Sequence, residues 1–235
     1  MTTLLALDTS SPRAGMALLK EGHYFDQVQW GPLNGHTQDL AKHYLDFLNL
    51  HQLTPSDIDA YAVTVGPGSF TGLRVGLSFV KGLALLQKNP VIGVSALATL
   101  ASAANQVSTF ICPMIDARRD EVYSALYQWR EGSLHLVLEE GAYAPNVWAE
   151  KVREISKSSL TIFGTGFRKY SSLFQKEELS YQELPNGFDE ISPRILAELA
   201  WSKFLKQDYF LGGIDLFPHY LRASEAELKA QGFGK

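Results

Sequence analysis

Cysteine, long apolar runs and clustered positive charge are scarce in this sequence of 235 residues. The single cysteine, Cys112, excludes an internal disulfide and is typical of a reducing compartment. No stretch is long and apolar enough to span a membrane, and the N-terminus lacks the basic start and long apolar middle of a signal peptide. We therefore expect a cytoplasmic protein that has no membrane partner.

The charge balance argues against one class of function. The formal net charge is −4, and the sequence contains no basic run. A protein that binds RNA or DNA tightly by itself normally carries a basic patch, so this function is disfavoured for the isolated chain. The remaining composition is ordinary for a soluble globular protein, and the length suffices for one large domain or two small ones with real cores.

The most informative stretch covers residues 62–87. A short β-branched run, 62–65, predicts a buried strand, and the glycine-rich segment 66–72 predicts a turn. A helix is expected to occupy the rest of the stretch, with Ser69 or Thr71 as its N-cap. The stretch therefore predicts a strand, a tight turn and a helix in immediate succession.

The turn could hold an anion, because a helix N-terminus presents free N–H groups and a positive dipole end. Its spacing is not that of a Walker A loop, since no Lys-Ser/Thr follows Gly72. It is not the dinucleotide fingerprint either, because Gly66, Gly68 and Gly72 are one residue too widely spaced. Phosphate binding and a purely structural turn both remain open.

The predicted helix carries little charge. Arg74 and Lys81 are its charged residues, and Gly72, Gly76 and Gly82 each cost roughly 1 kcal/mol of helix propensity relative to alanine. A helix that keeps such residues is expected to pack closely against another backbone. Because it has more apolar surface than one contact would use, we expect it to meet both its own sheet and a second surface.

Hydrophobic periodicity predicts two halves of similar design, each opened by three strands. In the first half, strands are expected at 3–10, 14–19, 23–30, 60–65 and 91–94, and helices at 37–53, 71–87 and 95–104. In the second half, strands are expected at 109–115, 121–129, 134–139 and 160–163, and helices at 145–156, 168–174 and 192–206. This order predicts a duplicated actin-like α/β fold with two lobes, each a mixed sheet flanked by helices. The lobes are expected at 1–106 and 107–190, followed by a return helix that braces the first lobe and a tail at 191–235.

Four motifs, in order along the chain, resemble the bacterial TsaB (YeaZ) family. They are segments 6–10 (Ala-Leu-Asp-Thr-Ser), 65–76 (Val-Gly-Pro-Gly-Ser-Phe-Thr-Gly-Leu-Arg-Val-Gly), 116–123 (Asp-Ala-Arg-Arg-Asp-Glu-Val-Tyr) and 218–222 (Pro-His-Tyr-Leu-Arg). The resemblance implies an actin-like, ribonuclease-H-like fold. It also implies a part in attaching threonylcarbamoyl to the adenosine beside the anticodon of tRNAs that read codons starting with A.

The same resemblance implies that the chain is not the catalyst. The family's catalytic paralogue, TsaD, carries the metal-binding pattern Asn-His-x-x-x-His after the equivalent helix and strand. Here Ala96 and Leu100 stand where the histidines would be, and neither can bind a metal. The expectation is a non-catalytic scaffold or activator subunit that has no metal.

The resemblance further implies that the two most apolar helices, 37–53 and 71–87, pair with the same helices of TsaD, or with themselves in a homodimer. The alternative is that their apolar faces pack on the chain's own sheet. The expected interface residues are Leu40, Tyr44, Phe47, Leu48, Leu73, Arg74, Leu77, Val80 and Lys81. A TsaE-like ATPase is a further expected partner, and tRNA is expected to bind only through the complex.

A nucleotide site is the open question. The bend at Asp8, Thr9 and Ser10 lies where an actin-like fold approaches phosphates, although Asp8 could instead be a turn residue that bonds nearby N–H groups. Gly66, Gly68 and Ser69 complete the candidate set. Phe70 and the crowded helix behind it can fill the cleft, so we expect no cofactor, or at most weak, vestigial ATP or ADP binding.

Two rival functions are kept. An actin-like phosphotransferase would use Asp8 or Asp116 as the base and magnesium on the phosphates. His36, Asp39 and His43 share one face of the helix expected at 37–53, and a metallo-glycoprotease-like peptidase would have Asp39 and His43 as its best available ligands. A solvated polar edge is the commoner explanation of that spacing.

Overall fold

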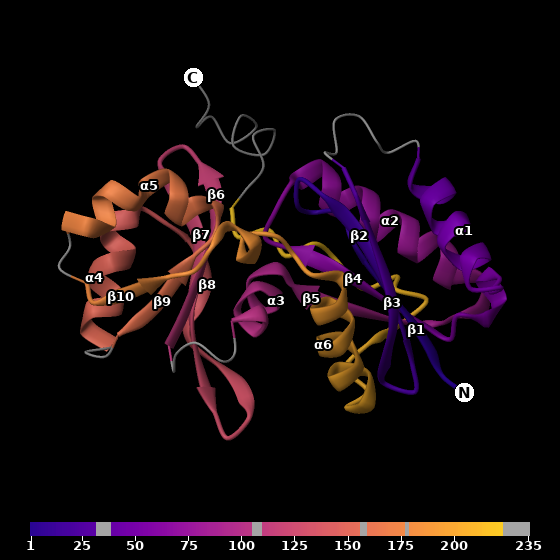
Figure 1. The fold of residues 1–235 in the computed structure, drawn as a ribbon. Coiled ribbons are helices and arrows are strands. Elements are labelled where there is room, and N and C mark those ends of the chain that lie inside the picture. The colour runs from indigo at the N-terminus through magenta and orange to yellow at the C-terminus, as the bar shows by residue number, and fades with distance from the viewer. Residues whose placement is uncertain (32–38, 105–109, 156–158, 177–178, 223–235) are drawn as a thin grey trace. The chain divides into compact units, whose positions relative to one another are not determined.

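The computed structural model describes residues 1–31, 39–104, 110–155, 159–176 and 179–222. The chain folds into two compact units (Figure 1). Unit 1 contains Met1–Thr99 and Ile191–Pro218, and unit 2 contains Leu100–Glu190 and the residues from His219 onward. Helix α3 (Ala96–Ala103) carries the chain out of unit 1.

Unit 1 is built on a six-stranded mixed sheet in the order β11-β5-β4-β1-β2-β3. Strands β1, β2 and β3 pair antiparallel, whereas β4 lies parallel to β1 and β5 parallel to β4. The strands are β1 (Thr3–Asp8), β2 (Ala14–Lys20), β3 (His23–Trp30), β4 (Ala60–Gly66), β5 (Pro90–Ser95) and β11 (Phe210–Leu211). The helices are α1 (Leu40–Leu50), α2 (Phe70–Gln87) and α6 (Pro193–Leu205), with a 3₁₀ turn at Pro55–Asp57.

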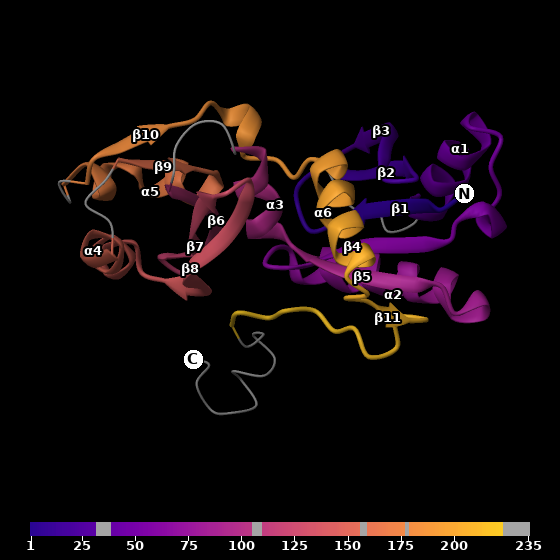
Figure 2. The same cartoon turned by 90° about the horizontal axis from the view of Figure 1, so that it is seen from below.

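The two faces of this sheet are covered by different helices. Along β1, Leu5 and Leu7 join the core under α1 and α2, and Leu4 and Ala6 join the core under α6. This division follows from the pleat, because successive side chains of a strand point to opposite faces. Figure 2 shows α6 lying across the strands of this sheet, and Figure 1 shows α1 next to α2. Burial on both faces explains why β1 reads as a continuous apolar run.

Unit 2 repeats the design with a five-stranded mixed sheet in the order β10-β9-β6-β7-β8. Three antiparallel strands open it, and β9 then pairs parallel to β6. The strands are β6 (Phe110–Arg118), β7 (Glu121–Arg130), β8 (Ser133–Tyr143), β9 (Leu160–Phe163) and β10 (Tyr181–Glu183). The helices are α4 (Pro145–Ile155) and α5 (Thr165–Lys176), with a 3₁₀ turn at Asn186–Phe188. Two mixed sheets of this kind confirm the duplicated actin-like fold.

Several boundaries differ from those expected. Helix α1 begins at Leu40, after Asp39, while Thr37, where this helix was expected to begin, lies outside the described residues. The charged turn expected after residue 115 is shorter, because β6 continues to Arg118. Strand β8 extends to Tyr143 instead of ending at residue 139. The short strands β10 and β11 were not expected, since two or three residues are too few to show a periodicity.

Candidate functional site

The glycine-rich turn connects β4 to α2, as expected. Strand β4 ends at Gly66, whose φ of 131° lies in the region that favours glycine. Helix α2 starts at Phe70, and Ser69 is its N-cap. The Ser69 hydroxyl accepts a hydrogen bond from the Gly72 amide at 3.2 Å, which identifies Ser69, not Thr71, as the capping side chain.

The Asp8 side chain is buried at the end of β1, with 1% exposed. Its Oδ1 accepts hydrogen bonds from the Ser10 amide at 3.0 Å and the Ser10 hydroxyl at 2.7 Å. Its Oδ2 accepts one from the Ser11 hydroxyl at 2.5 Å. Both carboxylate oxygens therefore serve the turn itself. The geometry agrees with Asp8 as a turn residue that holds its own backbone.

The turn after β1 packs directly on the glycine-rich turn. The Ser69 amide donates to the Ser10 carbonyl at 2.8 Å, and the Thr9 hydroxyl donates to the Gly72 carbonyl at 2.7 Å. A Cβ at Gly72 would lie 1.9 Å from the Thr9 carbonyl oxygen, and one at Gly68 would lie 2.8 Å from the Ser10 carbonyl oxygen. These glycines are needed because two backbones meet there.

The expected nucleotide-binding residues are thus brought together, but as an internal contact. The Ser69 and Gly72 amides, which a phosphate would need, already have acceptors inside the chain. The Asp8 oxygens already hold hydroxyl and amide donors. In this conformation the amides and carboxylate oxygens that a nucleotide site would use are engaged within the chain.

The corresponding turn in unit 2 also holds a carboxylate. Lys169 donates to Asp116 at 3.0 Å and 3.1 Å, and the Arg118 amide donates to it at 2.8 Å. The hydrogen bond that Lys169 donates to the Asp116 carboxylate is the main cause that raises the pKa of Lys169 above its usual range. The Asp116 amide in turn donates to Thr165 Oγ1 at 3.1 Å. Asp116 is therefore an ion-pair partner in this conformation, which is not the environment of a general base.

The residues of the expected partner interface fall into two groups in the structure. The seven apolar residues of that set have at most 4% of their surface exposed and pack in the core of unit 1; they are Leu40, Tyr44, Phe47, Leu48, Leu73, Leu77 and Val80. Their side chains face the chain's own sheet, which was the alternative left open, and their contact with a partner stays a prediction.

Arg74 and Lys81, the two charged members of the set, reach the surface of α2. The Arg74 guanidinium lies 3.8 Å from the centre of the exposed Phe70 ring. Lys81 donates to the Ile214 carbonyl at 3.1 Å and lies over the Phe217 ring. Lys81 therefore links α2 to the segment that follows β11, through Ile214 and Phe217.

The side of α2 that faces away from the sheet carries a row of residues that we call the outer stripe. We define it as Thr71, Val75, Ser78, Gly82 and Leu86, which follow one another at intervals of three or four residues and therefore share one face. Leu86 is 92% exposed, and its neighbour Leu85 is 51% exposed. Thr71, Ser78, Gly82 and Leu86 are exposed, whereas Val75 is partly buried and packs against the core of unit 1.

The residues weighed as metal ligands have other surroundings. The His43 ring stacks on Trp30 with centroids 4.4 Å apart, and His36 lies outside the described residues. Ala96 and Leu100, at the positions of the paralogue's histidines, are buried at 0% and 1% exposure. No group of three or more His, Cys, Asp or Glu that could hold a metal occurs in the part of the chain that the structure describes. Burial raises the pKa of the Cys112 thiol well above its ordinary value.

Comparison with known proteins decides the family. A family model described as TsaD, tRNA N6-adenosine threonylcarbamoyltransferase, matches residues 34–229. The TsaB protein of Bacillus subtilis is 32% identical over 231 residues, which cover 97% of each chain. The chain belongs to the TsaB family. The TsaB protein of Escherichia coli is 35% identical, over 75% of this chain and 77% of its own.

Solved structures agree with TsaB membership. YeaZ from Pseudomonas aeruginosa superposes with a TM-score of 0.79 at 32% identity, over 94% of this chain and 100% of its own. A second structure, described as an uncharacterized protein with similarity to peptidase YeaZ, gives a TM-score of 0.80 at 31% identity with the same coverage. No helix within the described ranges is long and apolar enough to cross a membrane.

Proposed function

We propose that this TsaB-family chain is a non-catalytic subunit in the biosynthesis of threonylcarbamoyladenosine in tRNA, and that it acts by forming a heterodimer with a TsaD-like paralogue. Relatives of matching length carry the name tRNA threonylcarbamoyladenosine biosynthesis protein. The target is the adenosine beside the anticodon of tRNAs that read codons starting with A. A TsaE-like ATPase and the tRNA join through the heterodimer.

Gly82 carries the proposal. Helix α2 contains three glycines, and two of them are explained by the chain itself: a Cβ would lie 1.9 Å from Thr9 at Gly72 and 2.3 Å from Thr9 at Gly76. A Cβ at Gly82 would meet no other part of the described chain within 4 Å. A glycine inside an exposed helix costs roughly 1 kcal/mol relative to alanine. Close approach of a second backbone to the outer stripe supplies a reason for keeping it.

The partner's fold supports the same surface. The TsaD family model matches residues 34–229 of this chain, a range that includes α1 and α2. A TsaD-like partner therefore has equivalent helices, and two such pairs can pack face to face about a pseudo-twofold axis. The same geometry lets two copies of this chain form a homodimer when the partner is absent.

The test is sedimentation of the chain alone and mixed with the TsaD-like protein of its own organism. A heterodimer that replaces the free species is expected. Gly82→Arg is expected to abolish it, and Gly82→Ala is expected to weaken it while raising the melting temperature of the isolated chain. Ser202→Arg, on the exposed side of α6, is the matched control. Normal assembly of both Gly82 variants would overturn the interface.

Catalysis is expected from the partner, not from this chain. Buried Ala96 and Leu100 support this view, because they leave no metal ligands at the paralogue's positions. The isolated chain is expected to transfer no threonylcarbamoyl group and to bind ATP weakly or not at all. Calorimetry with ATP and magnesium measures the second point, and a micromolar dissociation constant together with ATP turnover lost in Asp8→Ala would favour a phosphotransferase instead.

A further inference from the structure

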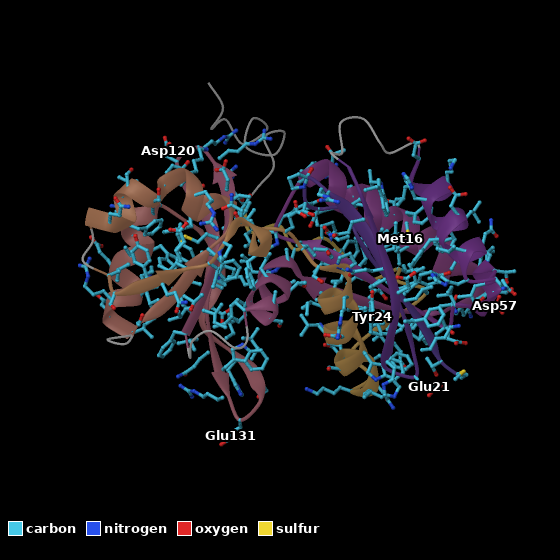
Figure 3. The ribbon with its side chains drawn as sticks, in the orientation of Figure 1. Met16, Glu21, Tyr24, Asp57, Asp120 and Glu131 are labelled. Atoms are coloured by element: carbon cyan, nitrogen blue, oxygen red, sulfur yellow. The ribbon has the colours of Figure 1, made fainter. Side chains whose placement is uncertain are left out.

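Three hairpins of this fold turn through two-residue loops. Strands β2 and β3 are joined by Glu21–Gly22, β7 and β8 by Glu131–Gly132, and β6 and β7 by Arg119–Asp120. All six residues have positive φ, which is the conformation of the tight turn favoured in hairpins. Figure 3 labels Glu21, Asp120 and Glu131 at the ends of their hairpins.

The β6–β7 turn differs from the other two in its residues. Two turns place glycine second, with φ of 78° at Gly22 and 76° at Gly132. The β6–β7 turn has no glycine, and Arg119 and Asp120 adopt φ of 53° and 58°. Arg118, immediately before them, also has a positive φ of 59°. Such a conformation costs a residue with a side chain roughly 1 kcal/mol or more, so a side chain here has a reason to be present.

Positive charge gathers around this turn, which we call the arginine tip: Arg118, Arg119 and Asp120. Both arginines are exposed. Two further cations form ion pairs beside them: Lys169 with Asp116 at 3.0 Å, and Arg222 with Glu121 at 2.7 Å.

Among the described residues around the tip, cations outnumber carboxylates. Arg222 also donates to the Ala117 carbonyl at 3.0 Å, which holds its guanidinium against the end of β6. Four cations, Arg118, Arg119, Lys169 and Arg222, face three carboxylates, Asp116, Asp120 and Glu121. The whole chain, by contrast, has a formal net charge of −4.

We propose that the arginine tip binds backbone phosphates of RNA. Guanidinium groups match phosphate geometry through paired N–H donors, and both arginines are exposed at the end of a hairpin. RNA is chosen over an acidic protein because the chain belongs to a family of tRNA-modification proteins. In this respect the inference rests on the proposed function. A patch this small gives weak binding alone and adds to the surface of a partner.

The test measures the affinity of an unmodified tRNA transcript that reads an A-starting codon, by fluorescence anisotropy at several KCl concentrations. The protein is the chain mixed with its TsaD-like partner, and the chain alone at low salt. The double variant Arg118→Ala with Arg119→Ala is expected to lower affinity about tenfold and to make the salt dependence shallower by about one to two phosphate contacts. Arg130→Ala, an exposed arginine beside the turn at the other end of β7, is the control and is expected to have little effect.

A second variant separates binding from folding. Arg119→Asn with Asp120→Gly installs the residue pair that this turn type favours. It is expected to raise the melting temperature of the chain and to lower tRNA affinity several-fold. A merely structural tip would gain stability and keep its affinity.

The outcomes are distinguishable. Unchanged tRNA affinity in both arginine variants, with the heterodimer still formed, overturns the tip and leaves the proposed function standing. Loss of the heterodimer in these variants makes the tip a protein contact and also overturns it. If the wild-type chain forms no heterodimer, the proposed function fails, and the tip is judged on the chain alone at low salt, where absence of arginine-dependent tRNA binding overturns it.

Discussion

The turn that closes the first hairpin differs sharply between the two units. In unit 1 the first residues of the turn after β1, Thr9 and Ser10, are buried, and their polar groups bond to Asp8 and to the glycine-rich turn. In unit 2 the turn after β6 is exposed, charged and strained. The strand order that follows is similar in both units. A duplicated fold therefore repeats its strands without repeating the chemistry of its turns, and the two turns are suited to different tasks.

The largest effect is expected where the buried turn meets the helix. Gly72→Ala would place a Cβ 1.9 Å from the Thr9 carbonyl oxygen, which is backbone and cannot rotate away. We expect a loss of about 3 kcal/mol in the free energy of unfolding, or failure to fold. Urea denaturation measures it. Gly82→Ala, in the same helix with open space around it, is the matched control and is expected to be stabilising.

Removing the carboxylate of the buried turn is expected to have the next largest effect. Asp8→Ala leaves the buried Ser10 hydroxyl and amide without the acceptor they have now, which should cost about 2 kcal/mol. Thermal and urea unfolding measure the change. A variant as stable as the parent would show that Asp8 is kept for something other than the turn, and would reopen the nucleotide hypothesis.

Asp57 offers a control for that result. It accepts comparable hydrogen bonds from the Thr54 amide and hydroxyl, both at 2.7 Å, but on the surface. Water can replace these bonds, so Asp57→Ala is expected to change stability less than Asp8→Ala. The Thr54 hydrogen bonds lower the pKa of Asp57 below its ordinary value of 3.8. Its contribution is therefore present above that pH and is lost as the pH falls through the lowered pKa.

Much of the fold could be predicted from the sequence because its strands have clear limits. Strand β3 (His23–Trp30) was predicted with its observed ends, since glycine-containing turns bound it on both sides. The tip at Arg119–Asp120 was missed as a tight turn. That type of turn is recognised from Asn-Gly or Asp-Gly, and Arg-Asp carries no such signal.

The candidate surfaces could be predicted only in part. Helical periodicity identified the apolar face of α1 and α2 correctly, as the burial of Tyr44 and Leu77 shows. It could not tell whether that face covers a sheet of the same chain or a partner, because both bury apolar area equally well. The useful signal was Gly82. The sequence does not distinguish Gly82 from Gly72 and Gly76. The structure does, because those two lie against Thr9, whereas Gly82 has no close neighbour within the described chain.

The smallest effect is expected in the ion pair beside the exposed turn. Asp116→Asn removes the partner of Lys169, but both side chains are partly exposed, at 30% and 45%, so the melting temperature should barely change. The local charge becomes more positive, and tRNA affinity of the heterodimer should therefore rise slightly at low salt and less at high salt. Anisotropy at two KCl concentrations measures this. A fall in affinity would mean that Asp116 holds Lys169 in a position that RNA binding requires. The loss of that positioning would then weaken RNA binding more than the removal of a negative charge strengthens it.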